Sequence, residues 1–182
     1  MKQLIIVLIL SMSVQVGWAQ KSKINWMSFE EALVAQKNEP RKIMMDVYTD
    51  WCGPCKLLDK NTFQNPDVVA FVNANYYAVK FNAEGDENIQ YKEFTFSNPN
   101  FDPKRKGRNA THELAGALNI SAYPTIVFFN ESGETLLPVK GYQSPNQLEL
   151  FLKLFNNDDY KKISTQEQWE TYQKQFIAKF KS

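Results

Sequence analysis

The stretch Asp-Val-Tyr-Thr-Asp-Trp-Cys-Gly-Pro-Cys-Lys, residues 46–56, contains the only two cysteines of the chain, Cys52 and Cys55. A disulfide stabilises a fold mainly by constraining a long loop of the unfolded chain, and a bond between these two would constrain almost nothing. The pair therefore indicates chemistry rather than structural support. We interpret it as a site that is oxidised and reduced in turn.

The residues around the pair predict a strand that leads directly into a helix, with Cys52 in the first turn of that helix. There the backbone N–H groups and the positive end of the helix dipole would lower the pKa of the Cys52 thiol, which makes it the attacking nucleophile. Cys55 lies nearly one turn later and could resolve a mixed disulfide. Pro54 fits the first turn because its missing N–H has no partner there, and Gly53 leaves the approach to Cys52 open.

Outward from the cysteines, the pattern of apolar residues predicts alternating helices and strands. Strands are expected over residues 42–49, 76–82, 125–130 and 134–140. Helices are expected over residues 28–40, 52–61, 66–75, 111–118, 145–155 and 164–182. Residues 84–109 lack such a pattern, and we interpret them as a long loop or insertion with a turn of helix near residues 89–94. This order predicts an α/β fold, a mixed sheet with helices on both faces.

The N-terminal residues have the composition of an export signal. Lys2 precedes a short apolar run, and Gly17-Trp18-Ala19 is a small-residue cleavage pattern, so we predict a cleaved signal peptide over residues 1–19. The remaining residues 20–182 suit one domain; an uncleaved N-terminal anchor is the alternative. Without Lys2 the basic and acidic residues are equal in number, which gives no sign of a nucleic-acid partner. An exported chain with a single vicinal cysteine pair indicates a protein that acts on disulfides.

Four segments in the same order carry a family resemblance. Residues 46–56 resemble the active-site segment of thioredoxins, including an aspartate six residues before the first cysteine. Val79-Lys80-Phe81-Asn82 resembles the strand that supplies a lysine beside that aspartate. Tyr123-Pro124-Thr125 resembles the cis-proline segment that faces the cysteines, and Lys140-Gly141 resembles the segment whose glycine lines the substrate groove. The resemblance covers residues 42–155 apart from the insertion, and it implies a thioredoxin-like three-layer α/β/α sandwich. It is stronger toward exported thioredoxin-like proteins and the soluble domains of periplasmic reductases than toward cytosolic thioredoxin.

One departure from thioredoxins concerns the helix after the cysteines. Thioredoxins usually carry a proline that kinks this helix, and Lys60 stands at the corresponding place. The helix is therefore expected to be straighter, or to end early near Asn61.

The resemblance assigns a role to each matched residue. Cys52 attacks a substrate disulfide, Cys55 resolves the intermediate, and Asp46, if buried beneath the pair, takes the proton of Cys55. Lys80 modulates the transfer of that proton. The substrate-binding residues would be Trp51, Gly53, Pro54, Tyr123, Pro124 and Gly141.

Each of these roles has a plainer alternative. Asp46 could be an ordinary carboxylate at the end of a strand, and Lys80 a solvated strand residue. Pro124 could follow a trans peptide bond, and Trp51 could belong to the core.

The function that follows is an extracytoplasmic thiol–disulfide oxidoreductase, with the periplasm as its compartment. The Gly-Pro pair between the cysteines resembles reducing thioredoxins, which favours reduction and implies a membrane thiol reductase as electron donor. Substrates would be exported proteins with disulfides, and we expect a monomer with no cofactor beyond its own cysteine pair and no metal. The alternatives are a copper site formed by Cys52, Cys55 and His112, or a redox-inactive interaction module.

Three further expectations concern residues outside the matched segments. His112, the only histidine, is expected at the surface. The stripe Trp169, Tyr172, Phe176 and Phe180 on the last helix is expected to pack on the domain rather than bind a partner. The insertion is expected either to select partners without taking part in the chemistry or to be a plain solvated loop.

Overall fold

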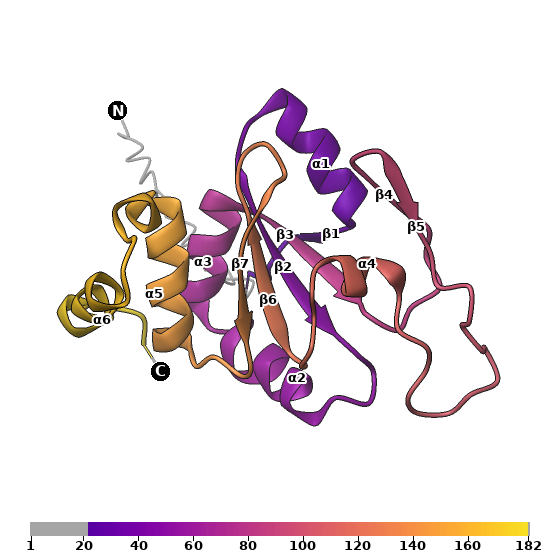
Figure 1. Cartoon of the computed structure of the whole chain (residues 1–182). Helices are drawn as coiled ribbons and strands as arrows, with labels where there is room; N and C mark the ends of the chain where they lie inside the picture. The colour runs from indigo at the N-terminus through magenta and orange to yellow at the C-terminus, as the bar shows by residue number, and fades with distance from the viewer. Residues whose placement is uncertain (1–21, 182) are drawn as a thin grey trace, which may run out of the picture.

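A five-stranded mixed sheet forms the centre of the molecule, seen in a computed structural model that describes residues 22–181 (Figure 1). The strand order is β1–β3–β2–β6–β7, with β1, β3 and β2 parallel and β6 antiparallel to both β2 and β7. The bounds are β1 Trp26–Met27, β2 Lys42–Tyr48, β3 Tyr76–Asn82, β6 Thr125–Phe129 and β7 Thr135–Lys140. The predicted mixed sheet is confirmed, whereas the predicted signal peptide, residues 1–19, lies outside the described residues.

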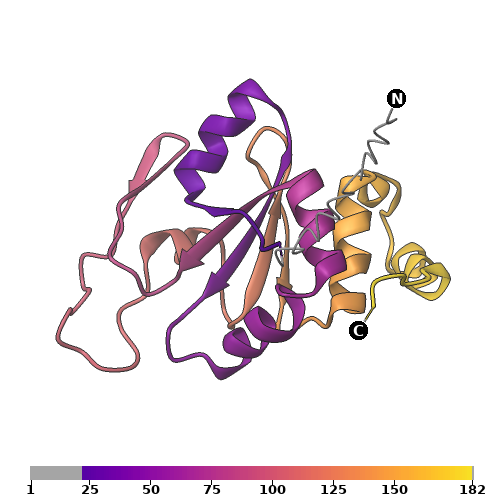
Figure 2. The same cartoon turned by 180° about the vertical axis from the view of Figure 1, so that it is seen from behind.

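Helices cover both faces of the sheet, which completes the three layers (Figures 1 and 2). One face packs against α1 (Phe29–Asn38) and α4 (Glu113–Ala117). The other face packs against α3 (Pro66–Asn75), α5 (Pro145–Asn156) and the turns that follow α2 (Gly53–Leu57). Ser28 and Ser144 cap the starts of α1 and α5, each as the first residue of a capping box.

Alternation along β2 decides which side chains face the cysteine-bearing helix. Met44 belongs to the apolar cluster beneath α3 and α5, and Met45 belongs to the cluster on the opposite face. Successive side chains of a strand point to opposite faces, so Asp46 shares the face of Met44. Lys80 lies directly beside Asp46 in the register of β2 with β3 and points to the same face.

The helix that carries the cysteines does not continue as a regular α-helix. After α2 the chain forms one π-helical turn, Leu58–Thr62, in which the N–H of Phe63 donates to the carbonyl of Leu58, five residues earlier. The structure therefore agrees with an early end near Asn61 and contradicts the straighter helix. A π-turn inserts one extra residue into the helix, which changes the directions of the neighbouring side chains.

The insertion contains a β-hairpin where a turn of helix was predicted. β4 (Ile89–Tyr91) and β5 (Phe94–Phe96) pair antiparallel, so the predicted turn of helix near residues 89–94 is wrong. The hairpin forms because Tyr91 packs on Phe29, with ring centroids 5.0 Å apart, and donates its hydroxyl to the carbonyl of Gly133 at 2.8 Å. Tertiary contacts thus override a locally ambiguous sequence.

The C-terminal segment is helical only in part. A short 3₁₀ turn (Asp159–Lys162) leads into α6 (Gln166–Gln175), so the prediction of a helix up to residue 182 is wrong at its C-terminal end. Trp169, Tyr172 and Phe180 pack against the core, which confirms packing for those three members of the stripe. Of the helices among residues 22–181, none is long and apolar enough to cross a membrane.

Residues 176–181, which we call the C-terminal strap, are held on α5 and α3 through their backbone. One oxygen of the buried Glu149 accepts the N–H groups of Lys179 and Phe180, both at 2.7 Å. Asp67 accepts the N–H of Lys181 at 2.8 Å. These bonds satisfy the backbone of the strap in an extended path, which explains why the helix stops.

Candidate active site

The two cysteines form a disulfide, with an S–S distance of 2.08 Å, at the start of α2. Cys52 caps the helix, and its sulfur accepts the N–H of Cys55 at 3.1 Å. Both are buried, with 2% of Cys52 and 3% of Cys55 exposed. Gly53 and Pro54 are exposed, and a Cβ at Gly53 would meet no atom within 4 Å. The surface next to the buried disulfide is therefore uncrowded at Gly53.

The segments that resemble the thioredoxin substrate groove lie together in the structure. The peptide bond between Tyr123 and Pro124 is cis. The carbonyl of Pro124 accepts the N–H of Gly141 at 2.8 Å, which joins the start of β6 to the end of β7. Tyr123 meets the ring of Trp51 edge-on, with centroids 5.9 Å apart. This contact connects the proline segment to the residue that precedes Cys52.

Asp46 is a buried carboxylate, with 1% of the residue exposed. One of its oxygens accepts a hydrogen bond from the Lys80 ammonium at 2.7 Å, and the other, Oδ1, has no hydrogen-bond partner among the described residues. Burial raises the pKa of Asp46 to about 6, although the charge of Lys80 opposes this rise. A carboxyl group that titrates near neutrality is suited to exchange a proton.

Lys80 is shared between two carboxylates. It also pairs with Asp59, which the π-turn carries, and its ammonium lies 4.9 Å from the ring centroid of Trp26 and 5.0 Å from that of Tyr48. Burial alone would lower the pKa of Lys80, but the two carboxylates hold it above its ordinary value. The sequence analysis missed Asp59. Its position four residues after Cys55, on the same helical face, was the available signal.

Trp51 is fixed by residues of the insertion as well as by Tyr123. Its indole Nε1 donates to Oε2 of Glu84 at 2.8 Å, and the same oxygen accepts the N–H of Asn109 at 2.7 Å. The guanidinium of Arg108 lies 4.3 Å from the centroid of the Trp51 ring. The insertion thus contacts the active-site tryptophan, which the sequence did not predict.

A cavity of about 470 Å³ lies between the active-site loop and the insertion. Trp51 forms part of its wall, and charged side chains dominate the remainder. The charged residues in the lining are Asp50, Glu84, Asp86, Asp102 and Arg105.

His112 is buried, with 1% exposed, so the predicted surface position is wrong. Its Nδ1 accepts the N–H of Leu114 at 3.1 Å, and its Nε2 lies 2.7 Å from the carbonyl oxygen of Glu87, to which it donates. Both ring nitrogens are therefore engaged, and neither has a lone pair directed at the cysteines. Within residues 22–181 no group of three His, Cys, Asp or Glu side chains is arranged to hold a metal ion.

Comparison with known proteins identifies the family. Residues 29–156 match the thioredoxin-like domain family. The thiol:disulfide interchange protein DsbD of Photorhabdus laumondii is 28% identical over 112 residues, which are 62% of this chain but only 15% of DsbD. The chain therefore spans a small part of that relative.

Two solved structures have similar folds. A Bacteroides thetaiotaomicron protein described as a candidate disulphide-isomerase shares 29% identity at a TM-score of 0.52, over 75% of this chain and 95% of that one. A thioredoxin-fold protein from Helicobacter pylori shares 15% identity at a TM-score of 0.57, over 82% of this chain and 86% of that one. With a disulfide between Cys52 and Cys55 at the start of a helix, the chain belongs to the thioredoxin-like family of thiol–disulfide oxidoreductases.

Proposed function

We propose that the protein reduces disulfides of exported proteins in the periplasm by dithiol–disulfide exchange. The observation that carries this proposal is the Cys52–Cys55 disulfide at the start of α2, next to the exposed Gly53. The export pattern in residues 1–19 and the 28% identity to DsbD support the compartment and the class of reaction.

The reaction starts from the protein with both thiols reduced. The Cys52 thiolate attacks one sulfur of the substrate disulfide, forms a mixed disulfide and releases the other substrate sulfur, which takes up a proton. Cys55 then loses its proton and attacks the sulfur of Cys52. The second substrate thiol leaves, and the Cys52–Cys55 disulfide forms. One substrate disulfide has gained two electrons and two protons, which the two protein thiols have lost.

We propose that Asp46, with Lys80 as its hydrogen-bond partner, accepts the proton that Cys55 loses. Asp46 is buried on the sheet face that packs beneath the cysteine helix, and its pKa of about 6 allows it to accept a proton at neutral pH. Lys80 bonds one Asp46 oxygen and leaves Oδ1 without a hydrogen-bond partner among the described residues. The free oxygen is the one we propose as the acceptor, directly or through a water molecule.

The reductive direction is proposed from the residues between the cysteines. Gly53 and Pro54 supply no charge that would strongly acidify Cys52, in contrast to oxidants of the family, which usually carry a histidine there. A reductase in an oxidising compartment needs an external dithiol donor to restore its own thiols, and we propose a membrane thiol reductase. The protein acts as a monomer, and the cysteine pair is its only redox group.

Reduction of insulin by dithiothreitol tests the proposal directly. The protein should accelerate insulin precipitation, and Cys52→Ser should abolish the acceleration. The Cys55→Ser variant is the matched comparison, because it keeps the attacking thiol and should accumulate mixed disulfides with substrates. Wild-type acceleration no greater than that of Cys52→Ser would overturn the proposed activity.

A further inference from the structure

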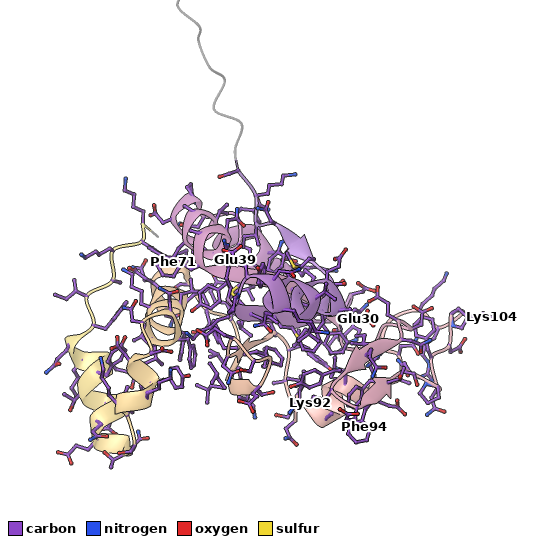
Figure 3. All side chains as sticks on the ribbon, turned by 90° about the horizontal axis from the view of Figure 1, so that it is seen from above. Glu30, Glu39, Phe71, Lys92, Phe94 and Lys104 are labelled. Carbon is purple, nitrogen blue, oxygen red and sulfur yellow. A yellow bond between two sulfur atoms is a disulfide. The ribbon has the colours of Figure 1, made fainter. Side chains whose placement is uncertain are left out.

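The outer part of the insertion, residues 104–108, concentrates positive charge beside the active site. Its sequence Lys-Arg-Lys-Gly-Arg holds four of the 21 basic residues of a chain whose charges nearly balance. All four basic residues are exposed, and none forms an ion pair with another residue in the described part of the chain. We call these residues the cationic tip. Figure 3 shows Lys104 at the outer edge of the molecule.

The cationic tip is a defined turn, because hydrogen bonds close it at its base. The N–H of Asp102 donates to the side chain of Asn109 at 3.0 Å, and the Asn109 amide donates back to the carbonyl of Asp102 at 2.9 Å. The Asp102 carboxylate accepts the N–H of Lys104 at 2.9 Å. Gly107 adopts a φ of +92°, which side-chain-bearing residues rarely adopt. The backbone that carries the cations is therefore held in a defined turn.

The base of the cationic tip is attached to the tryptophan that precedes Cys52. Arg108 lies over the Trp51 ring, and Asn109 shares the Glu84 carboxylate with the Trp51 indole. A polypeptide whose disulfide meets Cys52 would extend past Trp51 onto the cationic tip. Lys104 and Lys106 lie outside the adjacent cavity, whereas Arg105 shares that cavity with three aspartates.

We infer that the cationic tip docks substrate polypeptides that carry carboxylates a few residues from their disulfide. This inference rests on the proposed function. The carboxylates would lie along the outer side of the tip, because Asp50, Asp86 and Asp102 would repel them from the cavity. A polypeptide fits better than a nucleic acid or a lipid surface, because the cations fill only one short turn and the rest of the chain has more acidic than basic residues. Such complementarity raises association rates and specificity more than it raises intrinsic reactivity.

The test uses two cyclic disulfide peptides that differ only in three residues beside one cysteine, glutamate in one and glutamine in the other. The protein is reduced in advance, and the single-turnover rate of each peptide is measured at low and high salt. The variant carries Lys104→Gln, Arg105→Gln and Lys106→Gln, and it keeps Arg108 on Trp51. The matched control carries Lys174→Gln, Lys179→Gln and Lys181→Gln, which remove the same charge from exposed positions of the C-terminal segment.

The wild-type protein should reduce the acidic peptide about tenfold faster than the neutral one at low salt, the lower end of electrostatic steering. The preference should fall toward parity at about 1 M salt, where charges are screened within a few ångströms. The tip variant should lose the preference and the control should keep it. Equal rates for both peptides with the wild type, or an unchanged preference in the tip variant, would overturn the inference and leave the proposed function intact.

Two further outcomes separate the remaining possibilities. Failure of the reduced wild type to reduce either peptide would overturn the proposed function, and the inference with it. Binding to phosphatidylglycerol vesicles that only the tip variant loses, together with equal peptide rates, would assign the cationic tip to a membrane surface and overturn docking of acidic chains.

Discussion

The insertion and the C-terminal strap are both additions to the sheet and its helices, but they attach to opposite ends of the molecule (Figure 2). The insertion is attached through side chains, Glu84 and Arg108, that contact Trp51 beside the disulfide. The strap is attached through backbone N–H groups that donate to Glu149 and Asp67 on α5 and α3. From this difference we predict that the insertion affects the chemistry and that the strap affects the stability of the scaffold.

The largest effect is expected from Glu149→Ala. The substitution leaves two N–H groups of the strap and the Lys153 ammonium without their acceptor, in a site where Glu149 is fully buried. We expect the free energy of unfolding to fall by about 3 kcal/mol, as for a lost buried charged partner. Urea unfolding measures this loss, with the exposed Glu167→Ala as control. Insulin reduction by the folded variant should match wild type. A parallel loss of activity would contradict the assignment of the strap to stability alone.

Asp46→Asn tests the sheet beneath the cysteine helix, where the same substitution should raise stability and slow the chemistry. Because the folded pKa of Asp46 is about 6 and its ordinary value is 3.8, the folded state binds more protons between these two pH values. Its contribution to stability is therefore full below about pH 4 and is lost as the pH rises through 6, a loss of about 3 kcal/mol.

The variant should remove that loss, so its free energy of unfolding at pH 7 should rise by about 2 kcal/mol or more, with Lys80 still paired to Asp59. Its resolving step should slow at the same time. Urea unfolding between pH 4 and 7 measures the first effect, and decay of the mixed disulfide measures the second. The exposed Asp86→Asn is the control. Equal pH dependence of unfolding in variant and wild type would show that Asp46 titrates at its ordinary pKa.

Glu84→Ala tests the attachment of the insertion to the site. The indole N–H of Trp51 and the N–H of Asn109 would lose their shared acceptor, so Trp51 would keep only its contacts with Tyr123 and Arg108. We expect kcat/KM for insulin to fall about tenfold, which corresponds to about 1.4 kcal/mol. Glu84→Gln, which keeps an oxygen acceptor, should recover most of this loss, and Glu87→Ala should be neutral. A similar loss in Glu87→Ala would mean that charge, not the bond to Trp51, is responsible.

The smallest effect is expected from Lys162→Ala, near the start of the C-terminal segment. Its pair with Asp159 spans three residues on an exposed turn, with 76% of the lysine side chain exposed. Such pairs contribute less than about 0.5 kcal/mol. Urea unfolding should give a curve that overlaps wild type, which would separate the buried anchors of the strap from the surface charges of the preceding turn.

Local signals predicted most of the fold. The cap residues Ser28 and Ser144 indicated the starts of two helices, and runs of apolar residues indicated the central strands. The family resemblance predicted Lys80 beside Asp46, and in the structure the two lie at matching positions of neighbouring parallel strands. In these cases the residues that decide the structure are near one another in the sequence or follow a regular register.

The features that were missed depend on contacts between distant residues. His112 is buried because the carbonyl of Glu87, 25 residues away, accepts its Nε2 hydrogen. The last helix ends at Gln175 because Glu149, about 30 residues earlier, accepts N–H groups of the strap. Asp59 reaches Lys80 through a π-turn that propensity does not signal. No local pattern distinguishes His112 and Glu149 from ordinary polar surface residues, and for Asp59 only its spacing from Cys55 was a signal.

The way the strap is anchored has a consequence for which sequences it can tolerate. Lys179, Phe180 and Lys181 are held by N–H groups, which every residue except proline possesses. The positions of Lys179 and Lys181 could therefore accept almost any side chain, whereas Phe180 also packs its ring against Phe71 at 5.8 Å. If residues 179–181 are randomised and folded variants are selected, we expect proline to be absent from all three positions. Small residues should be absent from position 180 alone.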